Sequence, residues 1–221
     1  MIPWDDLHYF GPRNRAQDAT EDGFLVSEQE ITDLIEEMNH QFPALRIRRS
    51  DVLYSWAGIR PRTARVGFPA GGPGSVLHDL TERGAPNCYV YTGGLLMTHR
   101  HAGRAIATAV SQRMAPSRSA RPVPYAARSF PTEHNTPAIG EHYPSVSLSD
   151  LRFACKHEAV RTLDDLMFRR DRLGWSERMG ADVAHDAASA VRDIMGWSAE
   201  EATAQAAGYV ASLRRDYGLS A

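Results

Sequence analysis

The stretch from Cys88 to Arg104, CYVYTGGLLMTHRHAGR, limits most strongly how this chain can fold. Its first four residues favour a β-strand, and two glycines then interrupt that pattern. Thr98 is placed to cap a helix that follows. The apolar residues of that helix recur at helical spacing, at Ala102, Ala105, Ile106, Ala109 and Val110. The stretch therefore predicts a strand, a tight turn at Gly93 and Gly94, and a helix.

Such a turn directs free backbone N–H groups toward one point in space. Because Gly93 and Gly94 have no side chains, a ligand can approach their backbone closely. The start of a helix also favours a negatively polarised group. A phosphate, a carboxylate or an electron-rich ring carbonyl would suit this position. The alternative interpretation is an ordinary turn before a helix, which needs no ligand.

A second candidate stretch covers residues 51–61, DVLYSWAGIRP. Its residues alternate over 52–57 as in a β-strand. Arg60 follows, immediately before Pro61, whose ring restricts the backbone of the preceding residue. The planar guanidinium of Arg60 is suited to a carboxylate or a phosphate. An exposed arginine at the end of a strand is the alternative.

Composition narrows the class of protein. The chain has 221 residues, 43% of them hydrophobic, so it can bury one core or two small ones. Its formal net charge of −2 gives no reason to expect a nucleic-acid partner. No apolar run is long enough to span a bilayer. Cys88 and Cys155 form no CxxC pair and follow no secretory leader, which indicates reduced thiols in a cytoplasmic protein. Peripheral attachment to a membrane remains an alternative.

Other patterns divide the chain into parts. Residues 1–12 predict two short strands, and a capping box at Ser27 predicts a helix that ends near Phe42. The glycine-rich run around 71–74 predicts an ordinary loop, because no Lys-Ser/Thr pair follows it. Six prolines between 115 and 145 predict a linker.

The remainder, 147–221, predicts four short amphipathic helices and a small bundle. Helix starts are marked at Ser147, Thr162 and Ser198, and Gly196 closes the third helix. We therefore expect an α+β chain with a β-rich part over 1–115, a proline-rich linker over 116–146 and an all-α domain over 147–221. No metal site is predicted, because His99 and His101 have no third ligand near them in the sequence.

Several segments together resemble the C-terminal part of FAD-dependent glycerol-3-phosphate dehydrogenases, in the same order and with the same spacing. They are residues 2–4 with 9–11, residues 42–51, SWAGIRP at 55–61, GGLLMTHR at 93–100, and TLDD through GW at 162–175. The resemblance extends over nearly all of the chain except the proline-rich middle. It implies a β-rich fragment of a DAO-like FAD-dependent oxidoreductase, followed by a small helical domain.

In that family, FAD accepts a hydride from C2 of glycerol 3-phosphate, dihydroxyacetone phosphate forms, and electrons pass on to quinone. The resemblance implies that Arg60 contacts the small phosphorylated substrate and that Arg65 is a second candidate for this role. It further implies a cofactor-binding set of Gly93, Gly94, Leu95 and Thr98. No residue is assigned as the catalytic base. The resemblance also suggests contact with the inner face of the membrane.

Two departures from the family concern the flavin site and the dinucleotide-binding unit. Leu95 stands where the family has a lysine beside flavin and substrate, and a leucine can pack against a ring but carries no charge. No GxGxxG motif follows an opening strand, so the family's dinucleotide-binding unit is expected on a separate chain. Two alternatives stay open: a non-catalytic remnant or interaction module, and a related flavin oxidase acting on an amine or amino acid.

Overall fold

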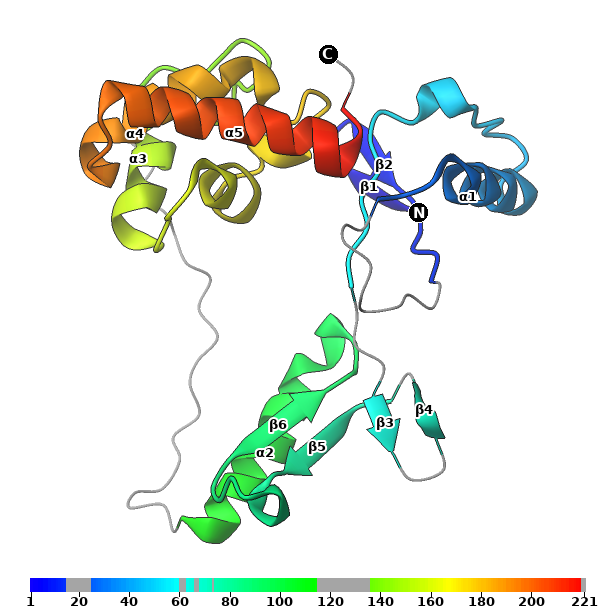
Figure 1. Cartoon of the computed structure of the whole chain (residues 1–221). Coiled ribbons are helices and arrows are strands. Elements are labelled where there is room, and N and C mark those ends of the chain that lie inside the picture. Colours follow the sequence, from blue (N-terminus) through cyan, green and yellow to red (C-terminus); the bar gives the residue numbers. More distant parts are fainter. Residues whose placement is uncertain (15–24, 60–62, 66–67, 73, 115–135, 220–221) are drawn as a thin grey trace. The chain divides into compact units, whose positions relative to one another are not determined.

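The computed structural model describes residues 1–14, 25–59, 63–65, 68–72, 74–114 and 136–219. These residues form two compact units, and Figure 1 shows the elements of each. The helical unit comprises Met1–Ala57 with Ser129–Ala221, and the hairpin unit comprises Gly58–Arg128. Helices and antiparallel strand pairs occur together in the chain, as the predicted α+β class requires.

The helical unit begins with the two strands predicted from residues 1–12. Strands β1 (Ile2–Trp4) and β2 (Leu7–Tyr9) pair antiparallel, with Ile2 opposite Tyr9. Helix α1 (Glu28–Gln41) then starts at the predicted capping box and ends at Phe42. The Ser27 hydroxyl accepts a hydrogen bond from the Glu30 N–H, and the Glu30 carboxylate accepts one from the Ser27 N–H. Both reciprocal hydrogen bonds of the capping box are therefore present.

The predicted C-terminal helices are also present. They are α3 (Leu148–His157), the π-helical η4 (Asp165–Arg170), α4 (Ala184–Met195) and α5 (Ala199–Tyr217). Side-chain capping boxes start α3 and α5, and Gly196 ends α4 with a left-handed backbone, φ 71°. Short 3-10 turns lie at η1 (Arg49–Asp51), η5 (Leu173–Trp175) and η6 (Ala181–Val183). Three apolar side chains in η4 or just before it are fully buried, namely Leu163, Leu166 and Met167.

The core of this unit extends beyond the helices. Ile139 and Tyr143 are buried in it, although they lie within the linker predicted over 116–146. Ala138 and Ser147 also form an isolated β-bridge, which holds this segment beside the start of α3. Residues 116–135 of that linker lie outside the described residues. The three-part division of the chain stays a prediction, and the structure groups residues 1–57 with the helices.

The segment 52–57 is not the β-strand predicted from its alternation. Its backbone meets the end of α5, where the Ser55 N–H donates to the Tyr217 carbonyl at 3.1 Å. Tyr54 shares a hydrogen bond of 3.2 Å with the Tyr9 hydroxyl, and Trp56 packs edge-on against Trp175. The strand prediction is wrong because the backbone of this segment pairs with no described strand, and its aromatic side chains contact Tyr9 of β2 and the helical elements.

The hairpin unit contains two antiparallel strand pairs and one long helix. Strands β3 (Thr63–Arg65) and β4 (Phe68–Gly72) form the first pair, and β5 (Val76–Asp79) and β6 (Tyr89–Thr92) form the second. The turn η2 (Thr81–Arg83) lies between β5 and β6. After β6 come the turn η3 (Leu96–Thr98) and helix α2 (His99–Arg113), as predicted. The loop prediction for the glycine-rich run is wrong in part, because Gly71 and Gly72 belong to β4 and pair with β3.

Both cysteines are free thiols, with Cys88 exposed and Cys155 partly buried. Burial raises the pKa of the Cys155 thiol to about 11, despite the nearby Arg152. None of the described helices is both long enough and apolar enough to cross a membrane.

The buried helical core predicts a large cost for truncating Leu166, whose side chain is fully buried. We expect Leu166→Ala to lower the free energy of unfolding by roughly 2–5 kcal/mol, because it leaves a cavity. Leu45→Ala removes the same atoms from a side chain that is 48% exposed, and this substitution should change the free energy of unfolding by only about 0.5 kcal/mol. All four tryptophans lie in the helical unit, so urea unfolding followed by their fluorescence measures this unit. Equal effects of the two substitutions would contradict the assignment of this core.

Candidate functional site

The candidate site is the turn between β6 and α2 in the hairpin unit. Gly93 and Gly94 have φ values of 75° and 82°, in the left-handed region that side chains disfavour. A Cβ on Gly93 would overlap the Gly74 carbonyl oxygen, and a Cβ on Gly94 would lie 3.3 Å from the Thr98 hydroxyl. The glycines are therefore required by close packing within the chain. The role predicted from the sequence, room for a ligand beside this backbone, stays a prediction.

Three polar side chains lie together behind this turn. The Thr63 hydroxyl donates to the Thr92 hydroxyl at 3.0 Å, and His78 Nε2 lies 2.8 Å from the same Thr92 oxygen. Thr63 is nearly fully buried, so its hydrogen bond holds β3 against the end of β6. Sequence reasoning missed this cluster. The only available signal was the position of Thr92, the last strand residue before the glycines.

Thr98 closes the turn and does not cap the helix as predicted. Its hydroxyl donates to the Leu95 carbonyl at 2.7 Å and accepts from the Leu95 N–H at 3.3 Å. No side-chain hydrogen bond caps the first turn of α2. The capping prediction is wrong because the 3-10 turn places the Thr98 hydroxyl over the residues before it.

The surface of the turn is apolar and is followed by basic residues. Leu95, Leu96 and Met97 are 55%, 87% and 78% exposed. Helix α2 contains no acidic residue, and its Arg100 and Arg104 are exposed without an ion pair to any described residue. The helix dipole adds positive potential at this same end. The arrangement suits a flat apolar ring with an electron-rich edge.

The predicted site residues fall in the hairpin unit, but the structure brings only some of them together. Gly93, Gly94, Leu95 and Thr98 are grouped at the turn. Arg65 ends β3 and is paired through its backbone with Phe68, and Arg60 lies outside the described residues. The substrate roles of the two arginines therefore stay predictions.

No metal centre is present among the residues that the structure describes. His99, half of the His-x-His pair noted in the sequence, has its Nδ1 2.8 Å from the Leu96 carbonyl oxygen. This contact places its ring against the turn before α2.

Residues 1–115 match the sequence model of the FAD dependent oxidoreductase family. This match covers more than half of the chain and includes the turn at Gly93 and Gly94. The chain therefore belongs to the FAD dependent oxidoreductases.

The proteins similar to this chain bear more specific names than the family model does. A glycerol-3-phosphate dehydrogenase from Synechocystis sp. is 31% identical over 133 residues, which are 59% of this chain and 24% of that protein. An aerobic glycerol-3-phosphate dehydrogenase from Staphylococcus aureus is 27% identical over 114 residues, 51% of this chain and 20% of that protein. The chain thus spans about a quarter or less of the curated relatives that it matches.

The packing at the turn predicts opposite effects for two glycine substitutions in the same unit. Gly93→Ala should destabilise the hairpin unit by more than about 1 kcal/mol, because of its positive φ and the overlap with Gly74. Gly103 lies within α2 with open space beside it, so Gly103→Ala should stabilise the helix by roughly 0.5–1 kcal/mol. Hydrogen exchange of peptides covering β6 and α2 measures both changes. Similar exchange in both variants would contradict this account of the turn.

Proposed function

We propose that this chain is the C-terminal part of an FAD-dependent oxidoreductase of the glycerol-3-phosphate dehydrogenase type. Such an enzyme oxidises glycerol 3-phosphate to dihydroxyacetone phosphate. The observation that carries the proposal is the family match over residues 1–115, joined to relatives that both bear this enzyme's name. Attachment to the inner face of the cytoplasmic membrane, where quinone would accept electrons, belongs to the same proposal.

The residues of the turn fit a flavin. Exposed Leu95, Leu96 and Met97 offer apolar surface to a ring, while Gly93 and Gly94 fix the backbone that carries them. When bound, FAD supplies the hydride acceptor of the reaction. The chain's own task is to hold the substrate in place by charge, and Arg60 and Arg65 are proposed for the phosphate.

Leu95 changes how charge is provided at this site. It offers packing where the family has a lysine, so it does not stabilise an anion. The first arginines after the turn along the chain are Arg100 and Arg104, in the first two turns of α2. We infer that they take over part of the electrostatic role. If they do not, the loss of the lysine favours a different substrate, such as an amine or amino acid.

The proposal includes a separate dinucleotide-binding chain as partner, and α2 carries the surface for it. Ala102, Ala105 and Ala109 are partly buried, but no residue of α2 is fully buried. The apolar surface continues around the helix onto exposed Ile106, Val110 and Met114, which we call the α2 apolar stripe. A helix with such a wide apolar face is typical of one packed on two sides.

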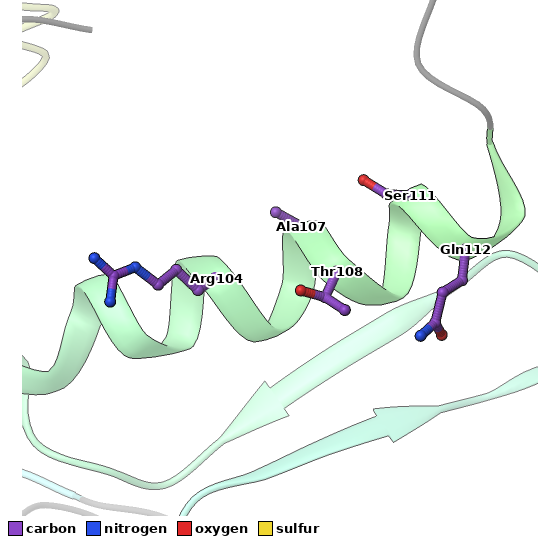
Figure 2. Close-up of a pocket in the computed structure, with 5 residues that line it drawn as sticks. All are labelled: Arg104, Ala107, Thr108, Ser111 and Gln112. Atoms are coloured by element: carbon purple, nitrogen blue, oxygen red, sulfur yellow. The ribbon is translucent and has the colours of Figure 1, made fainter. Parts of the chain in front are cut away.

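The adjoining face of α2 differs in character. A shallow, open hollow of about 530 Å³ runs along the helix and is lined by Arg104, Ala107, Thr108, Ser111 and Gln112, whose side chains are drawn in Figure 2. These side chains are small or polar, so this face is suited to solvent. The α2 apolar stripe is therefore the part of the helix that a partner unit would cover.

Flavin binding tests the proposed function directly. We expect the purified chain alone to retain no FAD, and a mixture with the N-terminal three quarters of the Synechocystis relative to retain flavin that glycerol 3-phosphate bleaches. Arg60→Gln should slow bleaching at least about tenfold, the loss of one charge-assisted contact. Arg83→Gln, an exposed arginine of the same unit, is the matched control and should have no effect. Retained flavin that an amine or amino acid bleaches, and glycerol 3-phosphate does not, would replace the proposed substrate.

The partner surface can be tested separately from chemistry. Val110→Asp places a charge in the α2 apolar stripe and should weaken association with that same N-terminal part by about tenfold or more, because a carboxylate would be desolvated. Thr108→Asp adds the same charge on the hollow face and should leave association unchanged. Sedimentation of the mixtures reports both. Equal loss in the two variants would show that charge alone, not this stripe, governs association.

A further inference from the structure

The helical unit contains a cavity that the proposed function does not use. It has a volume of about 500 Å³ and lies where the segment ending at Ala57 meets η4 and the end of α5. Four aromatic side chains line it, namely Trp56, Phe168, Trp175 and Tyr217. All of them belong to the helical unit, so the cavity is independent of the turn at Gly93 and Gly94.

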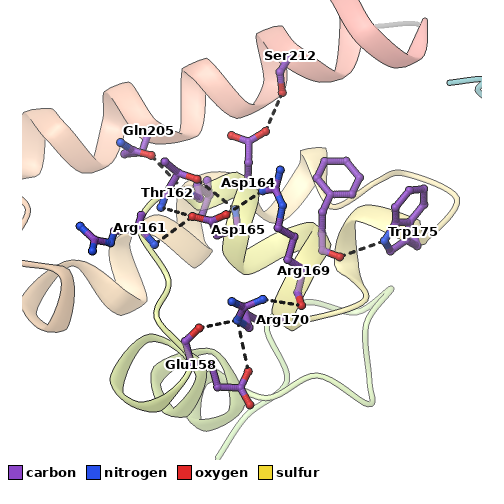
Figure 3. Close-up of polar contacts among 12 residues, drawn as sticks. Glu158, Arg161, Thr162, Asp164, Asp165, Arg169, Arg170, Trp175, Gln205 and Ser212 are labelled. Carbon is purple, nitrogen blue, oxygen red and sulfur yellow. Dashed lines mark hydrogen bonds and ion pairs between the residues drawn. The ribbon is translucent and has the colours of Figure 1, made fainter. Parts of the chain in front are cut away.

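The aromatic walls are held in place by ring contacts and hydrogen bonds. Phe168 stacks on Tyr217 with ring centres 5.1 Å apart, and Trp175 meets Phe168 edge-on at 5.2 Å. The Trp175 indole N–H donates to the Phe168 carbonyl at 3.1 Å (Figure 3). Trp56 completes the wall at 5.4 Å from Trp175, and its side chain is 44% exposed. A solvent-accessible aromatic surface of fixed geometry results.

A carboxylate that forms no ion pair with a described residue lies beside these rings, although the Arg215 guanidinium is near enough to interact with its charge. Asp164 lines the cavity, and among the described residues its carboxylate accepts one hydrogen bond, from the Ser212 hydroxyl at 3.2 Å (Figure 3). No described residue forms an ion pair with it. Its negative charge is therefore available to a ligand.

The other charged groups of the cavity are already paired. Arg169 forms an ion pair of 2.8 Å with Asp165, which starts η4 (Figure 3). The Asp216 carboxylate receives two hydrogen bonds of 2.6 Å from the neighbouring Arg215. The charged group of the cavity that no described ion pair engages is thus the Asp164 carboxylate.

We propose that this cavity binds an organic cation, either a guanidinium or a small ammonium group. The ring faces attract a cation through their quadrupoles, and Trp is the best of the aromatic side chains for this contact. The Asp164 carboxylate adds a direct charge-assisted interaction that neutral and anionic ligands would lack. The volume accommodates the end of an arginine side chain or a quaternary ammonium of similar size.

The test uses the full chain, labelled with ¹⁵N, and follows the indole N–H signals of its four tryptophans. N-acetyl-arginine amide and tetramethylammonium are titrated separately. We expect saturable shifts of the Trp56 and Trp175 signals and none at Trp4 or Trp197, which do not line the cavity. Stronger binding of the arginine derivative would identify a protein side chain as the ligand, and stronger binding of tetramethylammonium a small metabolite.

Two variants and one control decide the outcome. Asp164→Asn keeps the shape of the side chain and should weaken binding about tenfold. Glu177→Gln removes an acidic group from the exposed surface outside the cavity and should leave binding unchanged. Should Asp164→Asn unfold the chain, Trp56→Leu replaces it, because Trp56 is partly exposed and its loss removes a ring face.

Three results would overturn the proposal. The first is the absence of a saturable shift with either cation up to about 50 mM, well above weak millimolar affinity. The second is equal binding by the wild-type chain and the folded variant. The third is equal binding of N-acetyl-leucine amide, which has no charge. The measurement involves neither FAD nor glycerol 3-phosphate, so its failure would not affect the proposed function.

Discussion

The helical unit depends on a junction of aromatic side chains between segments far apart in the sequence. The Tyr9 hydroxyl donates to the Trp175 carbonyl at 3.1 Å and shares a second hydrogen bond with Tyr54. Burial raises the pKa of both tyrosines, and the neighbouring Tyr9 hydroxyl adds to the rise at Tyr54, so both stay protonated at neutral pH. These contacts attach the N-terminal strands and the segment 52–57 to the helices. Without them, two short strands would be too small to persist alone.

Sequence patterns predicted the elements whose causes are local. The capping boxes at Ser27, Ser147 and Ser198 start helices in the structure, and the left-handed backbone at Gly196 ends one. These signals are reliable because the hydrogen bonds involved join residues only three positions apart. The strand β6 and the helix after the glycines were predicted from local residue patterns, namely strand-favouring residues before Gly93 and apolar residues at helical spacing after Thr98.

Predictions failed where distant residues decide the structure. Alternation over 52–57 is as compatible with an extended segment as with a strand, and the partner is the end of α5, more than 150 residues away. Likewise, nothing local indicates that Thr63 would reach Thr92, or that Ile139 would enter the helical core from a proline-rich stretch. At the candidate site, the sequence predicted the position of the turn. It did not indicate that residue 93 must be glycine because the Gly74 carbonyl leaves no room for a side chain there.

The two units bury their apolar residues to different degrees, and this difference bears on function. Helical-unit residues such as Leu166 and Tyr209 are fully buried, whereas none of the described side chains of the hairpin unit is, and Thr63 alone comes close. A unit that exposes Ile106, Val110 and Met114 leaves unused the burial that stabilises folded domains. The Synechocystis relative is about four times longer than the segment it shares with this chain, and the partner unit proposed above is the simplest cover for this surface. The same absence of cover leaves Leu95, Leu96 and Met97 exposed at the turn, so one partner unit would both complete the fold and enclose the proposed flavin site.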